Sequence, residues 1–148
     1  MKRMIVNKYG GPENLVLEKC DPPTIKELSV RIKIENIGVN FADTLVIRGR
    51  YQERPRPPFS PGLELSGTII EIGSKVKSLK LNDRVVGIAK YGSYCDEIVM
   101  PAENVYTIPD SMDFITAASF PVAYGTAFGA IDWKGKLKKN QTCLILGA

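Results

Sequence analysis

The chain has 148 residues, of which 44% are apolar and 24% charged, and its formal net charge is +4. This composition is that of an ordinary globular protein, and the length allows one domain to bury a real core. The sequence contains no histidine. That absence excludes Ser-His and Cys-His nucleophilic sites and removes the commonest zinc ligand.

The cysteines and lysines exclude further classes of function. Three cysteines lie far apart in the sequence, which argues against a disulfide framework and is typical of a reducing compartment. The lysines are scattered and have no aromatic residues between them, so we predict solvated faces and no nucleic-acid site. The first residues lack the apolar stretch of a signal peptide, and we expect a cytoplasmic protein.

Short stretches rich in apolar and β-branched residues recur along most of the chain. The clearest spans 28–35, where apolar and polar residues alternate as in a half-buried strand. Turn residues separate these stretches, and the first two suggest a hairpin-like start. The predicted strands are 3–8, 15–17, 28–35, 65–72, 83–89 and 94–100. Many short strands predict a β-barrel or sandwich, and Asn82 is predicted to adopt a positive φ between two of them.

The segment 38–51 carries an amide, a carboxylate and a phenol on one connection: Asn40, Asp43 and Tyr51. It follows the best-defined strand and enters a short apolar stretch with helical character. Asp43 is predicted to cap or stabilise the start of that helix. The polar side chains make this connection a candidate site.

The character of the sequence changes after residue 108. Asp110 or Ser111 is predicted to cap a helix, and 114–131 is an uncharged run long enough to consider a membrane span. Its proline, glycines and hydroxyls favour two short helices that meet near Pro121 and pack on another domain. The apolar segment 142–147 is predicted to be a central parallel strand. Cys95 and Cys143 are therefore predicted to be inert core residues.

Eight short motifs in order resemble the medium-chain dehydrogenase/reductase superfamily, and within it the zinc-free quinone oxidoreductase (zeta-crystallin-like) branch. Each motif is weak alone, but their collinear order covers nearly the whole chain. The motifs are G-V-N-F-A-D, R-G-R-Y, P-G-L-E-L-S-G, N-D-R-V-V-G, G-S-Y-C-D-E, A-A-S-F-P, Y-G-T-A and L-I-L-G-A.

The resemblance implies a mainly β (α+β) fold. Residues 1–120 would form a GroES-like, partly open β-barrel with a few helices, the catalytic domain. Residues 121–148 would supply a linking helix and the first strand of a truncated Rossmann cofactor domain. Gly147 would be what remains of the loop that binds the cofactor pyrophosphate. We therefore expect this chain to be inactive alone, within a parent enzyme that uses NADPH.

The resemblance also implies that no zinc is bound. Asn40, Leu63 and Val122 stand where zinc-dependent relatives carry their metal ligands, and none of these side chains holds zinc. Without that Lewis acid, reduction of a conjugated acceptor is easier than oxidation of an alcohol. Glu64, beside Leu63, is predicted to be the buried partner of an arginine.

The candidate roles follow from the same resemblance. Asn40 and Tyr51 are the candidate catalytic residues; Thr126, Asn40, Phe41 and Gly147 are the candidate cofactor-binding residues. The alternatives are a helix-entry residue for Asn40, a loop anchor for Tyr51 and a packing residue for Thr126.

The expected substrate is a quinone or enone, reduced by NADPH, with no membrane partner. The alternative activity is 2-enoyl-thioester reduction, in which Tyr51 donates the proton. The alternative from another class is a non-catalytic GroES-like scaffold or binding module. An exposed apolar strand at 142–147 would also invite association into a homo-oligomer.

Overall fold

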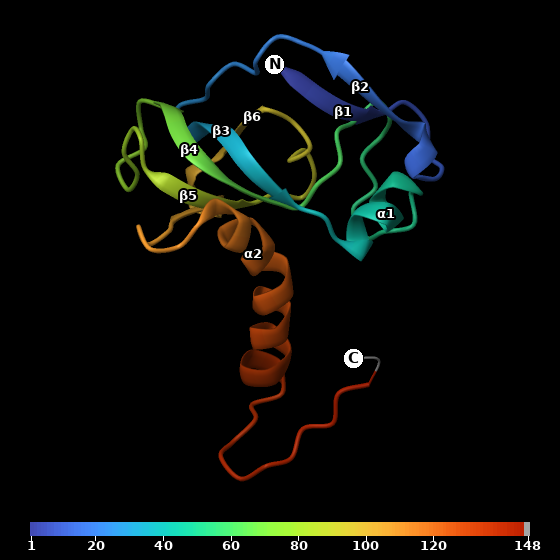
Figure 1. The fold of residues 1–148 in the computed structure, drawn as a ribbon, viewed down its shortest axis with the longest axis vertical. Helices are drawn as coiled ribbons and strands as arrows, with labels where there is room; N and C mark the ends of the chain where they lie inside the picture. The colour runs from blue at the N-terminus through green and yellow to red at the C-terminus, as the bar shows by residue number, and fades with distance from the viewer. Residues whose placement is uncertain (147–148) are drawn as a thin grey trace.

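The computed structural model describes residues 1–146 and contains two antiparallel sheets and two α-helices (Figure 1). The smaller sheet is a hairpin of β1 and β2, and the larger has the strand order β6-β3-β4-β5-β7. The strands are β1 Lys2–Val6, β2 Leu15–Lys19, β3 Ser29–Gly38, β4 Glu64–Ile72, β5 Arg84–Ile88, β6 Glu97–Pro101 and β7 Val105–Thr107. The helices are α1 Phe41–Ile47 and α2 Phe114–Phe128, the latter followed by a π-helix, Gly129–Lys134. This confirms the predicted mainly β, open-barrel fold, because the described strands do not close into a barrel.

The core lies on one face of the five-stranded sheet. Val30 and Ile32 of β3 are fully buried, as the alternation along that strand predicted. They pack with Leu65 and Ile69 of β4 and Val85 of β5 in the largest apolar cluster. The β1–β2 hairpin is joined by isolated bridges to the segments that carry Cys95 and Phe59.

Backbone hydrogen bonds hold that hairpin in place. The N–H of Met4 donates to the carbonyl of Tyr94 at 2.8 Å, and the N–H of Asp96 donates to the carbonyl of Lys2 at 3.0 Å.

Asn82 has a φ of 68°, which confirms the predicted positive φ at the turn before β5.

The helix α2 differs from the prediction in two ways. It begins after Asp113, whose carboxylate accepts from the N–H of Thr116 at 2.7 Å, so the predicted caps at Asp110 and Ser111 are wrong. It also continues through Pro121, so the prediction of two helices meeting there is wrong. Pro121 supplies no N–H, and the next N–H, that of Val122, is bonded to a side chain outside the helix.

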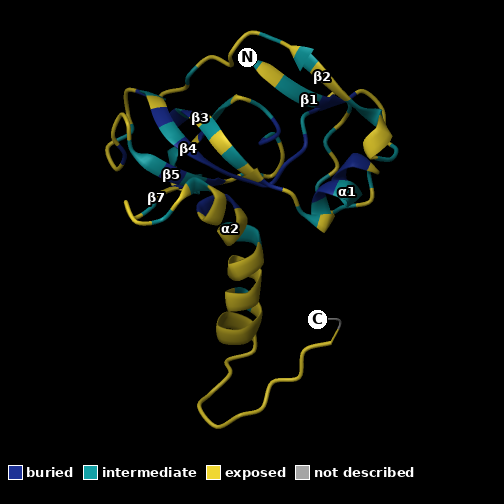
Figure 2. Cartoon of the chain, viewed as in Figure 1, coloured by how far each residue is buried: buried dark blue, intermediate teal, exposed yellow. Residues whose placement is uncertain are grey.

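Only the first turns of α2 pack on the sheet. Ala117 and Ala118 are buried, and the carbonyl of Phe114 accepts a hydrogen bond from Ser66 of β4 at 2.6 Å. Beyond Val122 the helix projects away from the sheets, and residues 123–128 are exposed (Figure 2). The predicted boundary between 120 and 121 falls inside this helix, and the two-domain division stays a prediction.

The helical segment Phe114–Lys134 is long and apolar enough to cross a membrane, judged by length and composition alone. The prediction of no membrane partner therefore stays a prediction.

Residues 142–146 form no strand, so the predicted strand is not present in the described part of that segment. Cys143 is exposed, not a core residue. Leu144 and Leu146 are more than four-fifths exposed, and self-association through this segment stays a prediction. Gly147 lies outside the described residues.

Candidate active site

Two of the predicted site residues, Tyr51 and Thr126, line the same pocket of about 400 Å³. Tyr51 comes from the loop after α1, and Thr126 from the exposed part of α2, one turn after Val122. The other lining residues are Gln52, Glu53, Leu63, Ile88, Ala89, Lys90, Pro121, Val122 and Gly125. Leu63 and Val122, two of the positions discussed for zinc, thus contribute apolar surface to its wall.

Asn40 is not among the residues that line this pocket. It is the N-cap of α1, and its backbone N–H donates to the Asp43 carboxylate at 2.7 Å. This confirms the structural role predicted for Asp43. The Asn40 side chain donates from Nδ2 to Oε1 of Glu64 at 2.8 Å. Phe41, the next residue, is 78% exposed and is not among the lining residues.

Glu64 is the residue that connects Asn40 to the pocket wall. Its side chain is buried, and its second oxygen, Oε2, accepts the backbone N–H of Val122 at 2.8 Å. The predicted arginine partner is wrong, because both donors are uncharged amides. Gly38 pairs with Glu64 across β3 and β4, and a Cβ at Gly38 would overlap the Glu64 side chain.

Asp43 is the buried carboxylate of α1 that accepts the backbone N–H of Asn40. Its carboxylate is buried and also accepts a hydrogen bond from the hydroxyl of Tyr94 at 3.1 Å. Burial raises the pKa of Asp43, and the hydrogen bonds from Asn40 and Tyr94 oppose that rise. Burial, with the Asp43 charge, also raises the pKa of Tyr94, which keeps the phenol protonated as a donor.

We expect Tyr94→Phe to lower the free energy of unfolding by about 1.5–3 kcal/mol near neutral pH, since it removes a hydrogen bond to a buried charge. The pKa of Asp43 should rise further, because one of the interactions that lower it is lost. A raised folded-state pKa favours the neutral carboxyl, so the loss should shrink as pH falls toward about 4. Urea unfolding across that range measures it.

Tyr106→Phe is the matched control for this prediction, because the Tyr106 side chain is half exposed on β7. It should change stability by no more than about 0.5 kcal/mol at any of these pH values. A Tyr94→Phe protein as stable as the parent chain near neutral pH would contradict the role given to this hydroxyl.

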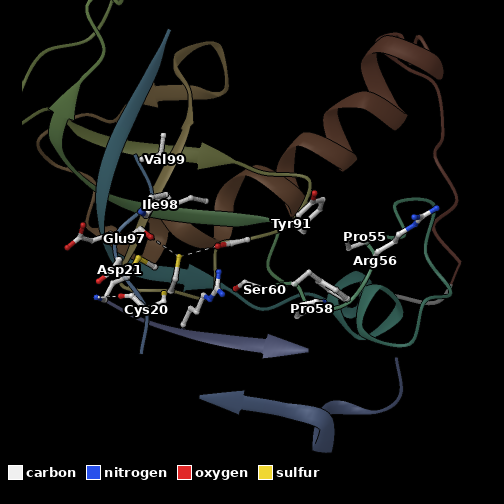
Figure 3. Close-up of a pocket in the computed structure, with 16 residues that line it drawn as sticks. Cys20, Asp21, Pro55, Arg56, Pro58, Ser60, Tyr91, Glu97, Ile98 and Val99 are labelled. Carbon is white, nitrogen blue, oxygen red and sulfur yellow. Dashed lines mark hydrogen bonds between the residues drawn. The ribbon is translucent and has the colours of Figure 1, made fainter. Parts of the chain in front are cut away.

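A second pocket of about 610 Å³ lies between the β1–β2 hairpin, the loop 53–61, which contains four prolines, and β6 (Figure 3). Cys20 and Asp21 lie at one end and Pro55 and Arg56 at the other. Cys95 also lines it, and burial raises the pKa of its thiol to about 12, with Asp96 adding to the rise. The raised pKa keeps this thiol protonated near neutral pH, where it is a poor nucleophile, but Cys95 is only partly buried and is not the core residue that was predicted. None of the candidate catalytic residues lines the pocket.

Sequence reasoning missed the charged rim of the first pocket. Lys90 and Glu53 form an ion pair at 3.3 Å between the turn after β5 and the loop that carries Tyr51. Their only signal in the sequence was position, since Lys90 directly follows a predicted strand and Glu53 lies two residues after Tyr51. Both side chains are solvent-exposed, so the pair contributes little to stability.

Residues 26–110 match the family described as Alcohol dehydrogenase GroES-like domain. The chain belongs to this family. Its relatives place it further, as an N-terminal domain of the quinone oxidoreductase-like type within the medium-chain dehydrogenase/reductase superfamily. The resemblance recognised in the sequence is thereby confirmed.

Three comparisons illustrate the likeness. The chain is 39% identical over 149 aligned positions to Quinone oxidoreductase-like protein 2 homolog of Nematostella vectensis, covering 99% of this chain and 40% of that protein. The crystal structure of human synaptic vesicle membrane protein VAT-1 homolog-like protein superimposes with a TM-score of 0.90 at 31% identity, over 93% of this chain and 44% of that one. The crystal structure of the Escherichia coli quinone oxidoreductase complexed with NADPH superimposes with a TM-score of 0.78 at 29% identity, over 91% of this chain and 41% of that one. The chain thus spans less than half the length of these relatives.

Proposed function

We propose that this chain is the substrate-facing part of an NADPH-dependent, zinc-independent reductase of quinones or enones. The observation that carries the proposal is the pocket shared by Tyr51 and Thr126. One wall offers a phenol that can donate a hydrogen bond to a carbonyl, and the other a hydroxyl on the face of α2. In the acceptor, conjugation spreads the incoming charge, so the protein needs mainly to align the reactants and donate hydrogen bonds.

The chemistry of the donor set supports zinc independence. The Asn40 side chain is already bonded to Glu64, and Leu63 and Val122 present hydrocarbon. Among residues 1–146, no group of three or more Cys, Asp or Glu side chains could hold a metal ion. Zinc requires thiolate, imidazole or carboxylate ligands, so these residues do not fit it.

The same wall fits a planar nicotinamide ring. Gly125 is open, because a Cβ there would meet no atom within 4 Å, so a flat ring can approach the α2 backbone beside Thr126. Thr126 would hold the ring through its hydroxyl, and Tyr51 would face the acceptor. Reduced nicotinamide supplies the hydride when it is bound. The Escherichia coli relative in complex with NADPH supports this choice of cofactor.

The test is NADPH oxidation by the protein that carries this sequence, assayed with a benzoquinone and with a crotonyl thioester. For quinone reduction, Tyr51→Phe should lower kcat/KM by less than about tenfold, since alignment survives without the hydroxyl. If the protein is instead an enoyl-thioester reductase, Tyr51 protonates carbon, and that activity should fall by about 10²-fold or more. Tyr51 on the pocket wall is the observation that keeps this second candidate open.

The control is Tyr124→Phe, on the same helix but absent from the pocket wall, which should leave both activities unchanged. Turnover of neither acceptor would contradict the proposal and favour a binding module. Full retention of both activities in Tyr51→Phe would remove Tyr51 from the mechanism.

A further inference from the structure

One buried carboxylate hydrogen-bonds two separate elements of the candidate site. Glu64, on β4, is 2% exposed. Its Oε1 accepts from the side chain of Asn40 at the start of α1, and its Oε2 accepts from the backbone of Val122 in α2, both at 2.8 Å. No cation is among its hydrogen-bond or ion-pair partners in residues 1–146.

The donors in these two bonds fix the chemistry of the group. An ionised carboxylate is acceptor-only, so it satisfies two N–H groups at once, which a neutral amide in its place does not. Bonds from N–H groups to an ionised acceptor are stronger than neutral ones. Pro121, directly before Val122, has no N–H of its own, so the helical hydrogen-bond pattern has a gap at this turn, and the Val122 N–H donates to Glu64.

The packing around Glu64 also leaves its side chain little room to move. Gly38 lies opposite it, and a Cβ there would overlap Oε1, so the carboxylate occupies the space that a side chain on β3 would fill. The side chain is enclosed between β3, the start of α1 and the turn of α2 that carries Val122.

We propose that Glu64 is a positioning residue whose carboxylate sets Asn40 and the Val122–Thr126 wall of the pocket relative to each other. This carboxylate cross-links the two elements without a metal ion. The inference rests on the proposed function for its purpose, but the cross-link itself can be tested without turnover.

The test moves the charge from one partner to the other in the 148-residue chain. Asn40→Asp places a second carboxylate against Glu64 and should break the cross-link. Adding Glu64→Gln should restore it, because the introduced amide can accept from Val122 through its oxygen and donate through its nitrogen to the carboxylate introduced on α1. The readout is amide hydrogen exchange of Val122, measured relative to the core amide of Leu65, which reports global opening.

We expect Asn40→Asp to speed exchange of Val122 relative to Leu65 by about tenfold or more near neutral pH. The double variant should return it to within about threefold. Two facing carboxylates come to share one proton as pH falls, so the defect in Asn40→Asp should fade with falling pH. The double variant should depend on pH less, because only the carboxylate introduced at residue 40 and the neighbouring Asp43 then face each other. A purely steric defect would not follow pH in this way.

The second readout is the shift of the Thr126 amide resonance on titration with tetramethylbenzoquinone, which has no free ring position for thiol addition. We expect the shift to weaken in Asn40→Asp and to recover in the double variant. Unchanged Val122 exchange in Asn40→Asp, or no recovery in the double variant, would overturn the positioning role. If Val122 exchange changes as expected in both variants but the Thr126 resonance of the parent chain does not shift with the quinone, the cross-link is supported and the proposed function is not.

Discussion

Gly62→Ala should be among the most destabilising single-methyl additions in this domain, with a loss of about 2–6 kcal/mol in the free energy of unfolding. Gly62 has a φ of 104°, a conformation that side chains rarely adopt. An added Cβ would also overlap the Ser93 hydroxyl and the Tyr94 ring. The methyl group would therefore push Tyr94 away from Asp43, beneath the candidate site.

Gly92→Ala separates the two causes. Gly92 has a similar φ of 113°, but the nearest atom to an added Cβ would be 3.7 Å away. Gly92→Ala should therefore be destabilised only by the backbone strain of a side chain at this φ, which costs about 1–3 kcal/mol. Urea unfolding of both variants measures the difference, and equal losses would contradict the overlap with Ser93 and Tyr94.

Leu65→Ala should lower the free energy of unfolding by about 2–5 kcal/mol, because it opens a cavity in the largest cluster. Leu65 is fully buried, and its side chain alternates with that of Glu64 on β4. We therefore expect the hydrogen bonds of Glu64 to survive in the folded state of this variant. The measurement is the unfolding midpoint together with the side-chain amide resonance of Asn40.

Leu81→Ala is the matched control, since Leu81 is 56% exposed in the turn before β5. It should change stability by about 0.5 kcal/mol or less. Similar losses in both leucine variants would mean that the cluster around Leu65 does not dominate the stability of the domain.

The strands were predictable because their signal is local. The alternation along β3 and the β-branched residues in β4 and β5 indicate burial directly. The positive φ of Asn82 was predictable because asparagine tolerates that conformation better than most residues. The capping role of Asp43 was predictable for the same reason. Family motifs then identified the fold as GroES-like, which periodicity alone would have left as barrel or sandwich.

Two of the errors came from interactions between residues distant in sequence. Pro121 predicted a break in the helix, but the carboxylate that accepts the following N–H lies on β4, and no local pattern reveals it. Glu64 was expected to meet an arginine, since a buried charge commonly finds an opposite charge. Arg84 lies on the adjacent strand but is paired with Thr68, not with Glu64. It donates to the carbonyls of 109, 110 and 112 and lies over the Phe114 ring.

The candidate site was predictable in part. The motifs supplied Tyr51 and Thr126, and the structure brings both to one pocket. They supplied Asn40 as a group that donates directly to substrate or cofactor, whereas one of its N–H bonds is used by Glu64. The roles of Asn40, Tyr51, Thr126 and Phe41 stay predictions. The motif could not reveal the bond between Asn40 and Glu64, because the two residues are far apart in the sequence.

The hydrogen bond from Val122 to Glu64 makes a proline and a glutamate, far apart in sequence, mutually dependent. In a descendant that replaces Pro121 with a residue bearing an N–H, the helix can restore its own bonding pattern, and the carboxylate is then held only by its bond from Asn40, which loosens the constraint on residue 64. In a descendant that loses the carboxylate first, the proline becomes a defect. Natural variation should therefore pass through the proline before the glutamate, and chains that retain Pro121 without an acidic residue at 64 should be rare.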